Sequence, residues 1–254
     1  MEFFGPYTYL ITNILSISIP LLVSLHPKSH FHGKWKSFFP AVCLTGLFFI
    51  SWDVAFTSIG IWSFNPDYLT GISFLGLPIE EYLFFICIPY ACIYTYTFIQ
   101  SRLSGYKQLI AKGGQVFTIL LIFFMTIVSI IYFSKLYTFV LASSFLLFLI
   151  WLSQSKFKMH AGYVYLAYLP LLIPFYLVNG TLTGMYTDEP IVMYNNLENS
   201  GLRWETIPIE DIFYGLFLIT STAIMHEYFE LKINKVLTGQ KANYSNLVTK
   251  IHKQ

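Results

Sequence analysis

The chain has 254 residues, of which 56% are hydrophobic and only 11% are charged, and its formal net charge is +2. Its mean hydropathy of +0.60 lies far above that of soluble globular domains, and so weak a positive charge indicates no nucleic-acid partner. These values exclude an ordinary soluble domain and predict an all-α membrane protein that crosses the bilayer several times.

Seven apolar stretches are long enough to cross a hydrocarbon core of ~30 Å at a rise of about 1.5 Å per residue. In chain order they cover residues 7–25, 38–59, 78–99, 116–133, 136–152, 161–178 and 207–225. Only Ser134 and Lys135 separate the fourth stretch from the fifth. We therefore predict seven transmembrane helices, with a very short connection between the fourth and the fifth.

The basic residues are distributed unevenly between the two faces of the membrane. With seven spans, every Lys and Arg residue except Lys135 and Arg203 falls on one face. Because positively charged loops stay in the cytoplasm, we expect the N-terminus outside and the C-terminus inside, in a bacterial cytoplasmic membrane. Residues 231–254 then form a basic cytoplasmic tail that lies on the membrane or is disordered.

A short acidic motif opens two of the predicted spans. Pro78-Ile79-Glu80-Glu81 begins the third span, and Pro208-Ile209-Glu210-Asp211 begins the seventh. We interpret the chain as an internal duplication, in which residues 1–112 form the first three-helix repeat, 113–135 a linking helix and 136–230 the second three-helix repeat. A single linking span gives both repeats the same polarity, so we expect parallel repeats related by an axis along the membrane normal.

Both acidic pairs are expected at the outer end of the bundle. Asp53 lies about 22 Å along the second span, at the depth where the third span begins, and Asn179 has the corresponding place in the sixth span. Neighbouring residues in a helix are about 100° apart, so at most one member of each pair points into a shared cavity. Acids that merely complement the helix dipole are the alternative interpretation, but capping does not require adjacent acids in both repeats.

Such a cluster of acids indicates acid–base chemistry. Carboxyl groups crowded into a poorly solvated site cannot all ionise, so one keeps its proton while another acts as a base. Aromatic rings around them stabilise a cation without reacting with it. The candidate rings are Trp52, Trp62, Tyr82, Phe84, Phe85, Trp204, Phe213 and Tyr214. This combination is what a proton-initiated carbocation rearrangement of a hydrocarbon needs.

The two motifs, Asp53 and the Trp62-Ser63-Phe64 loop closely resemble the integral-membrane lycopene cyclases, which occur as two small subunits or as one fused chain. The resemblance covers nearly the whole chain. It implies a fused lycopene β-cyclase, an isomerase that closes the ψ-ends of lycopene to β-ionone rings, through γ-carotene to β-carotene, without net redox change.

The resemblance also implies roles for individual residues. The catalytic set that it implies is Asp53, Glu80, Glu81, Glu210 and Asp211, with Glu80 or Glu210 as the proton donor. The implied substrate contacts are Trp62, Tyr82, Phe84, Phe85, Asn179, Phe213 and Tyr214. The second repeat departs from the first in having Asn179 where the first has Asp53.

The expected ligands follow from what the sequence contains. No GxGxxG segment follows a strand pattern, so the flavin-dependent class of lycopene cyclase is excluded and no bound flavin or NAD(P) is expected. Cys43, Cys87 and Cys92 lie inside predicted spans without CxxC spacing, so no metal site is expected. The expected partners are lycopene or a related ψ-end carotenoid and membrane lipid, and the chain could also pair with a second copy.

Two other classes of membrane protein also place acids inside the bilayer. An intramembrane glutamate protease of the CAAX-processing type uses a Glu-Glu pair, but Phe84 stands four residues after Glu80, where an Arg is expected. A proton-coupled transporter is often built from paired repeats, but it needs a polar route to the cytoplasmic side, and these acids cluster at the other end. Both classes stay open as alternatives.

Overall fold

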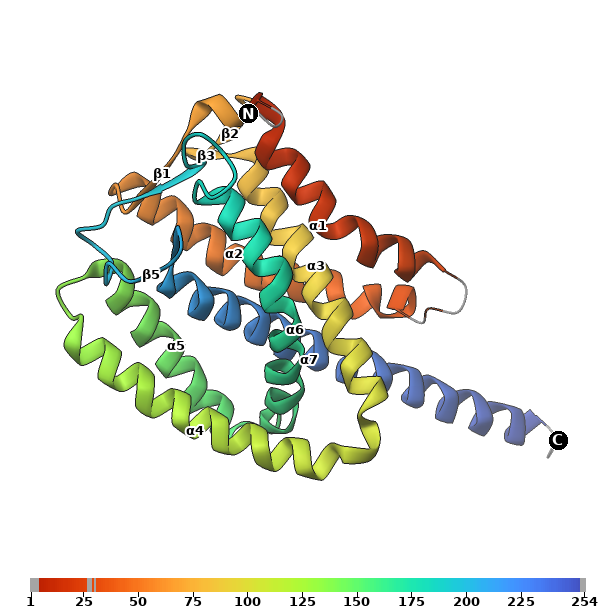
Figure 1. Cartoon of the computed structure of the whole chain (residues 1–254). Helices are drawn as coiled ribbons and strands as arrows, with labels where there is room; N and C mark the ends of the chain where they lie inside the picture. The colour runs from red at the N-terminus through yellow and green to blue at the C-terminus, as the bar shows by residue number, and fades with distance from the viewer. Residues whose placement is uncertain (1–4, 27–28, 30, 252–254) are drawn as a thin grey trace.

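The computed structural model describes residues 5–26, 29 and 31–251, and the side chains within these ranges as far as residue 238. The described residues form a bundle of seven α-helices with short β-hairpins at one end (Figure 1). The helices are α1 (Thr8–Leu25), α2 (Trp35–Ser58), α3 (Ile79–Arg102), α4 (Lys107–Ile131), α5 (Leu136–Gln154), α6 (Lys158–Leu182) and α7 (Ile209–Ile251). The prediction of an all-α protein is confirmed.

The lengths and compositions of the helices indicate a multi-pass membrane protein. In the described part of the chain, six helices, α1 to α6, are long and apolar enough to cross a membrane. The remaining helix, α7, carries Glu210 and Asp211 in its first turn and polar residues at Thr220 to Thr222. These polar side chains are buried, because this part of α7 packs against α2, α3, α5 and α6. The seventh span stays a prediction.

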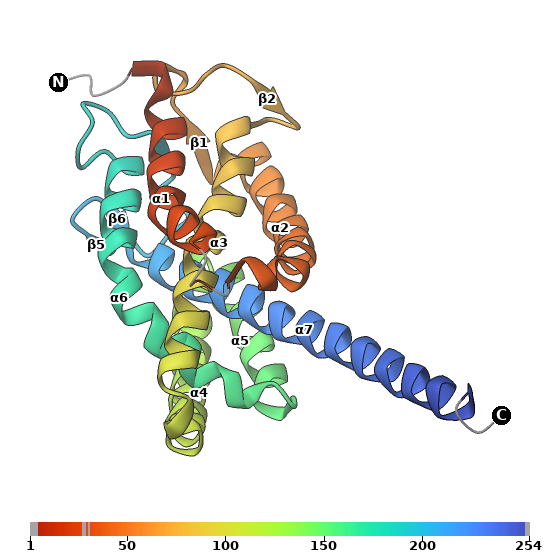
Figure 2. The same cartoon turned by 90° about the vertical axis from the view of Figure 1, so that its right-hand side faces the viewer.

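The last helix extends well beyond its predicted span. Residues 231–251 continue α7 as one helix that projects away from the bundle (Figure 2). The tail is thus helical rather than disordered, and its contact with the membrane surface stays a prediction. The sequence after Glu230 contains no proline, so nothing in it interrupts the backbone hydrogen bonds of the helix. Residues 252–254, the end of the predicted tail, lie outside the described residues.

The same order of elements occurs twice along the chain. Two helices, a strand, a β-hairpin and a third helix follow one another first as α1, α2 and α3, and again as α5, α6 and α7, with α4 between the two series. The strands are β1 (Trp62–Phe64), β2 (Ser73–Phe74), β3 (Leu77–Pro78), β4 (Val192–Tyr194), β5 (Arg203–Trp204) and β6 (Ile207–Pro208). This order agrees with an internal duplication, whereas the axis that relates the repeats stays a prediction.

A tight hairpin precedes each acidic helix. In the β2–β3 and β5–β6 hairpins, Leu75 and Glu205 have left-handed backbones with φ of 49° and 55°, as two-residue hairpin turns require. Pro78 and Pro208 are the last residues of the two hairpins. Since proline suits the start of a helix, α3 and α7 begin at the next residue, and their acids fall in the first turn.

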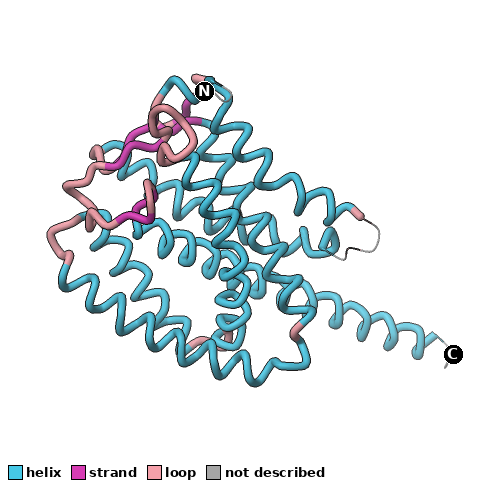
Figure 3. The backbone as a smooth tube through the Cα atoms, in the orientation of Figure 1, coloured by secondary structure: helices cyan, strands magenta, loops and turns pink. Residues whose placement is uncertain are grey.

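The long loops of the two repeats are joined to each other. Strands β1 and β4 pair in antiparallel fashion, with Trp62 opposite Tyr194 and Phe64 opposite Val192. The pair, drawn in magenta in Figure 3, lies at the end of the bundle where α3 and α7 begin. The two loops thus form one cover over that end.

The other close contact that shapes the bundle lies between α4 and α6. A Cβ atom added to Gly114 would lie 2.5 Å from Cα of Gly162, and one added to Gly162 would lie 2.2 Å from the carbonyl oxygen of Ile110. Only glycine permits the two backbones to approach so closely. The linking helix α4 is therefore fixed against the second repeat.

Candidate active site

Three carboxyl groups from three helices line one pocket. Asp53 comes from the last turns of α2, Glu81 from the first turn of α3 and Asp211 from the first turn of α7. All three side chains are buried, with exposed fractions of 4%, 7% and 5%. The two repeats therefore contribute to one cluster of acids at one end of the bundle, as the duplication of the motif predicts.

The first acid of each motif lies behind the pocket and binds the preceding loop. Glu80 accepts the backbone N–H of Thr70 at 2.8 Å, and Glu210 accepts that of Ser200 at 2.7 Å. Glu210 also accepts the hydroxyl of Thr138 at 2.6 Å. Neither glutamate lines the pocket. The positions of Glu80 and Glu210 therefore give no support to the expectation that one of them donates the proton. Their bonds hold the two loops against the helix starts.

Each carboxyl group of the pocket accepts a hydrogen bond from at least one tyrosine. Tyr9 donates to Glu81 at 2.6 Å and Tyr214 donates to Asp53 at 3.2 Å. Asp211 accepts two such bonds. Sequence reasoning missed Tyr9, although its position in the first turn of α1 matches that of a tyrosine in the first turn of α5.

Asp211 is held by one phenol on each of its oxygens. Tyr137, in the first turn of α5, donates to Oδ1 at 2.6 Å, and Tyr194, on β4, donates to Oδ2 at 2.8 Å. Burial and the adjacent Asp211 carboxylate raise the pKa of Tyr194 well above its usual range, so this phenol keeps its proton and remains a donor. Two donated bonds stabilise the ionised form of a carboxyl group. Sequence reasoning missed both tyrosines.

Besides their separate tyrosine partners, Asp53 and Glu81 lie against each other. Their carboxyl groups are close enough to interact directly. Two carboxylates repel each other, whereas a carboxyl and a carboxylate attract, so such a pair holds one proton between its members. The pocket therefore contains two different arrangements: two adjoining carboxyl groups, Asp53 and Glu81, on the first-repeat side, and the single carboxyl group of Asp211 with two phenol donors on the second-repeat side.

The two repeats differ at two corresponding positions in the pocket. Asn179 on α6 corresponds to Asp53 on α2, and Phe84, three residues after Glu81, corresponds to Tyr214, three residues after Asp211. Asn179 and Phe84 both line the pocket, and the amide of Asn179 donates to the carbonyl of Phe175 at 3.3 Å. A second carboxyl–phenol pair is thus replaced by an amide and an apolar ring.

Away from the acids the pocket is apolar and deep. It follows α3 from Glu81 to Cys92, a distance of about 16 Å at the rise of an α-helix, with Ile88 and Ala91 between them. Leu171 of α6 and Ile219 of α7 line the same depth. The pocket thus has an acidic end and an apolar interior.

The predicted aromatic walls are divided between the pocket and other parts of the bundle. Trp62, Phe84 and Tyr214 line the pocket. Tyr82, Phe85 and Phe213 do not: Tyr82 donates to the carbonyl of Phe74, Phe85 stacks on Phe49 at 6.3 Å, and Phe213 packs on Phe124 at 5.2 Å. The other two candidate rings, Trp52 and Trp204, also lie outside the lining. These five rings lie on faces of their helices or hairpins that do not face the pocket.

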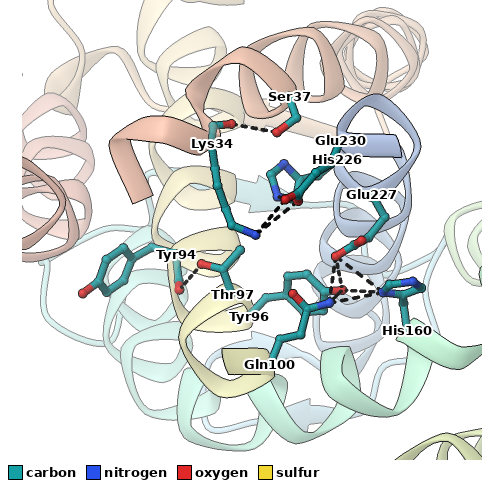
Figure 4. A network of polar contacts seen from close by, with 10 residues as sticks. All are labelled: Lys34, Ser37, Tyr94, Tyr96, Thr97, Gln100, His160, His226, Glu227 and Glu230. Atoms are coloured by element: carbon teal, nitrogen blue, oxygen red, sulfur yellow. Dashed lines mark hydrogen bonds and ion pairs between the residues drawn. The ribbon is translucent and has the colours of Figure 1, made fainter. Parts of the chain in front are cut away.

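A second polar network lies at the opposite end of the bundle (Figure 4). Glu227 accepts the phenol of Tyr96 at 2.8 Å and the amide of Gln100 at 2.9 Å, and it lies 3.4 Å from Nδ1 of His160. His226 and Glu227 are both buried, with exposed fractions of 0% and 7%. The network ties α3, α6 and α7 together. Among the described residues no group of His, Cys, Asp and Glu is suited to hold a metal ion.

A family model described as "Lycopene cyclase" matches the chain twice, over residues 6–99 and over residues 134–229. The two matches together cover well over half of the chain. The first contains Asp53 and Glu81, and the second contains Asn179 and Asp211. Searches of curated proteins and of solved structures gave no match.

Proposed function

The chain belongs to the lycopene cyclase family, and on this premise we propose that it is a lycopene β-cyclase of carotenoid biosynthesis. It closes the ψ-ends of lycopene, or of a related ψ-end carotenoid, to β-ionone rings by way of γ-carotene to β-carotene. The observation that carries the proposal is the convergence of Asp53, Glu81 and Asp211 at one end of an apolar pocket. The reaction is an isomerisation, so it needs an acid and a base but no oxidant.

The acid in this mechanism is the Asp53–Glu81 pair. Its shared proton adds to the terminal double bond of the ψ-end and leaves a tertiary cation on the carbon that bears the two methyl groups. The bond from Tyr9 stabilises the carboxylate that remains on Glu81. General acid catalysis of this kind contributes roughly 10²–10⁴-fold to a rate.

Ring closure then moves the positive charge. The internal double bond attacks the cation, one carbon–carbon bond forms, and a second tertiary cation appears within the new six-membered ring. Asp211 removes a proton from the adjacent ring carbon, and the electrons of that C–H bond become the ring double bond. A carbocation loses its proton readily, so a carboxylate stabilised by Tyr137 and Tyr194 is a sufficient base. The proton then returns to the pair, and none is consumed overall.

The walls of the pocket protect the cation. Trp62 lies with its ring 5.3 Å from that of Tyr137 and 6.0 Å from that of Tyr194, so the β1–β4 cover closes the pocket with aromatic rings. Such rings stabilise a nearby cation electrostatically. By excluding water they also prevent its capture as an alcohol.

The remaining residues of the motifs have supporting roles in this proposal. Glu80 and Glu210 position the loops through Thr70 and Ser200. Asn179 and Phe84 contact the substrate without titrating, which leaves the acid on one side of the pocket and the base on the other. Tyr82, Phe85 and Phe213 contribute to packing instead of to substrate contact.

The topology belongs to the same proposal. Residues 1–112 and 136–230 form two parallel repeats, 113–135 link them, and residues 231–254 follow as a cytoplasmic extension. Seven spans place the N-terminus outside and the C-terminus inside a bacterial cytoplasmic membrane. The alternatives of a CAAX-type protease and a proton-coupled transporter find no support in the family match.

Expression in a cell that accumulates lycopene tests the function directly. The expected result is a change from lycopene to cyclised pigment on chromatography, and unchanged lycopene overturns the proposal. Purified protein is then dialysed and assayed in detergent or liposomes without added flavin or NAD(P). We expect full activity, because no step transfers electrons to or from the substrate.

A further inference from the structure

The acid end of the pocket is covered by the loops. Trp62 and Phe64 of β1, with Val192 and Tyr194 of β4, form part of its lining, and Trp62 and Val192 are buried. The β1–β4 pair joins the loops of both repeats across this end of the bundle (Figure 3). A substrate end therefore does not reach the acids through this cover without breaking the pairing.

The lining is most exposed along α6. Lining residues from α2, α5 and the deeper part of α7, namely Asp53, Tyr137, Leu218 and Ile219, are buried. Pro174 of α6 is the most exposed lining residue, and the partly exposed ones are Ser16 of α1, Phe84, Ile88 and Ala91 of α3, Phe175, Val178 and Asn179 of α6, Tyr214 and Gly215 of α7, and Phe64 and Tyr194 of the cover. Helices α1 and α6 contact each other and lie side by side in Figure 2. The pocket therefore opens between α1 and α6, with α3 as its back wall.

The surface around this opening is apolar. Leu15 and Ile19 on α1 have exposed fractions of 63% and 72%, and Ile173 and Leu177 on α6 have 70% and 53%. The hydroxyl of Ser16 is already bonded to the carbonyl of Asn13 at 2.8 Å. In a membrane such a surface faces lipid tails, so a hydrocarbon reaches the pocket without crossing water.

We propose that the gap between α1 and α6, the lateral opening, is the entrance through which a linear polyene passes from the bilayer into the pocket. The same opening holds the unreacted part of the polyene while its end is cyclised. This inference rests on the proposed function, because it assigns the occupant as the substrate. The proposal follows from two requirements. The reacting end of the polyene must reach buried acids, and the rest of the polyene is too long for the pocket alone, since a carotenoid is roughly as long as the ~30 Å bilayer core.

The helix on one side of the opening has a weakened backbone. Pro170 and Pro174 lie inside α6, one helical turn apart, and each removes a backbone hydrogen bond of the helix. Pro174 itself lines the pocket. Bending of α6 at the opening therefore costs little free energy. Such bending would widen the opening for a rigid polyene.

A pair of serines on α1 provides a matched test. Ser16 lines the pocket, whereas Ser18 lies outside its lining and donates to the carbonyl of Leu15 at 2.8 Å, in the same manner as Ser16 to Asn13. The Ser16→Cys and Ser18→Cys proteins in native membranes are treated with a benzyl methanethiosulfonate, which dithiothreitol removes again. Treated wild-type membranes give the baseline for the native cysteines.

The bulky group at position 16 is expected to lower cyclisation by roughly tenfold or more relative to the same protein untreated, and dithiothreitol is expected to restore it. Treatment of the Ser18→Cys protein is expected to have no effect beyond the baseline. Recovery on reduction shows that blocking, not misfolding, caused the loss. A labelled Ser16→Cys protein that remains active, or equal inhibition of both proteins, overturns the lateral opening.

Occupancy is measured separately from turnover. The rate at which the Ser16→Cys thiol reacts is compared between membranes that contain lycopene and membranes free of carotenoid. We expect slower labelling with lycopene at position 16 and no change at position 18. Equal rates at position 16 would mean that lipid alone fills the opening, and would refute the proposal. Failure of the proposed function would appear differently: lycopene would slow labelling of the Ser16→Cys protein, but neither the unlabelled Ser16→Cys membranes nor wild-type membranes would cyclise it.

Discussion

The phenol of Tyr137 donates a 2.6 Å hydrogen bond to Oδ1 of Asp211 and so joins the first turn of α5 to the first turn of α7. The first repeat contains the same relationship, since Tyr9 of α1 donates to Glu81 of α3 at the same distance. In each repeat a tyrosine at the start of the first helix thus fixes the second acid of the motif. The repeats differ in the second neighbour of that acid. Glu81 lies beside Asp53, whereas Asp211 accepts a hydrogen bond from Tyr194.

Replacement of Glu81 is expected to be far more damaging than replacement of its neighbour Glu80. Glu81→Gln removes one of the two carboxyl groups of the acid pair, and we expect cyclisation to fall by roughly 10²–10⁴-fold. In Glu80→Gln the amide oxygen still accepts the N–H of Thr70, so activity stays within about tenfold of wild type. Pigment analysis at equal membrane expression measures both. A larger loss of activity in Glu80→Gln than in Glu81→Gln would indicate that Glu80 is the proton donor.

Loss of Asp53 is expected to remove the shared proton of the acid pair. In Asp53→Asn the amide donates to Glu81 and stabilises it as a carboxylate, so we again expect a fall of roughly 10²–10⁴-fold. The corresponding change in the other repeat, Asn179→Asp, supplies a carboxyl at the equivalent position but beside Phe84, which has no phenol. Adding it to Asp53→Asn is therefore not expected to restore the rate, and restoration would show that the two sides of the pocket are interchangeable.

Removal of the base is expected to change the product as well as the rate. In Asp211→Asn the acid pair still starts ring closure, but the ring cation loses a proton from another neighbouring carbon. We expect a rate loss of roughly 10²-fold or more and a residual product whose ring double bond is displaced out of conjugation. Absorption spectra of the separated pigments detect this displacement. Residual β-rings alone, or the same change of product in Glu210→Gln, would contradict Asp211 as the base.

The phenols around Asp211 are expected to act through that residue. Tyr137→Phe leaves Oδ1 of Asp211 without this donor, and we expect cyclisation to fall by roughly tenfold, which corresponds to about 1.4 kcal/mol. Tyr194→Phe should behave similarly, and the double variant should show a non-additive loss because both act on one group. Tyr165→Phe is the matched control, since its phenol is bonded to Thr118 at 2.8 Å outside the pocket. An equal loss in the control would indicate a general effect of removing a buried hydroxyl.

Turnover in D2O is expected to incorporate deuterium into the product. The proton of the Asp53–Glu81 pair exchanges with solvent before it is transferred, so the new ring gains a carbon-bound deuterium, at most one per ring. Mass spectrometry of the cyclised carotenoid reads this directly, and lycopene recovered from the same sample is its control. Cyclised product without any deuterium would rule out protonation by an exchangeable carboxyl group.

Much of the architecture is predictable from the sequence because lipid imposes a simple rule. A segment that crosses the membrane must be apolar and helical, so α1 to α6 can be located from hydropathy alone. The ends are less predictable: α4 begins at Lys107 although its apolar stretch begins at residue 116, because lysines at the membrane surface are compatible with a helix. The extent of α7 through Ile251 likewise carries no hydropathy signal.

The sequence by itself determined the membrane class, the duplicated acidic motif at the starts of α3 and α7, and the family, since these depend on composition and on local order along the chain. Only the tertiary structure decided that Glu81 and Asp211, rather than Glu80 and Glu210, face the pocket. Adjacent residues in a helix point about 100° apart, and the rotation of α3 and α7 about their axes is set by the helices packed against them. For the same reason the phenol partners Tyr9, Tyr137 and Tyr194 appear only once distant segments are brought together.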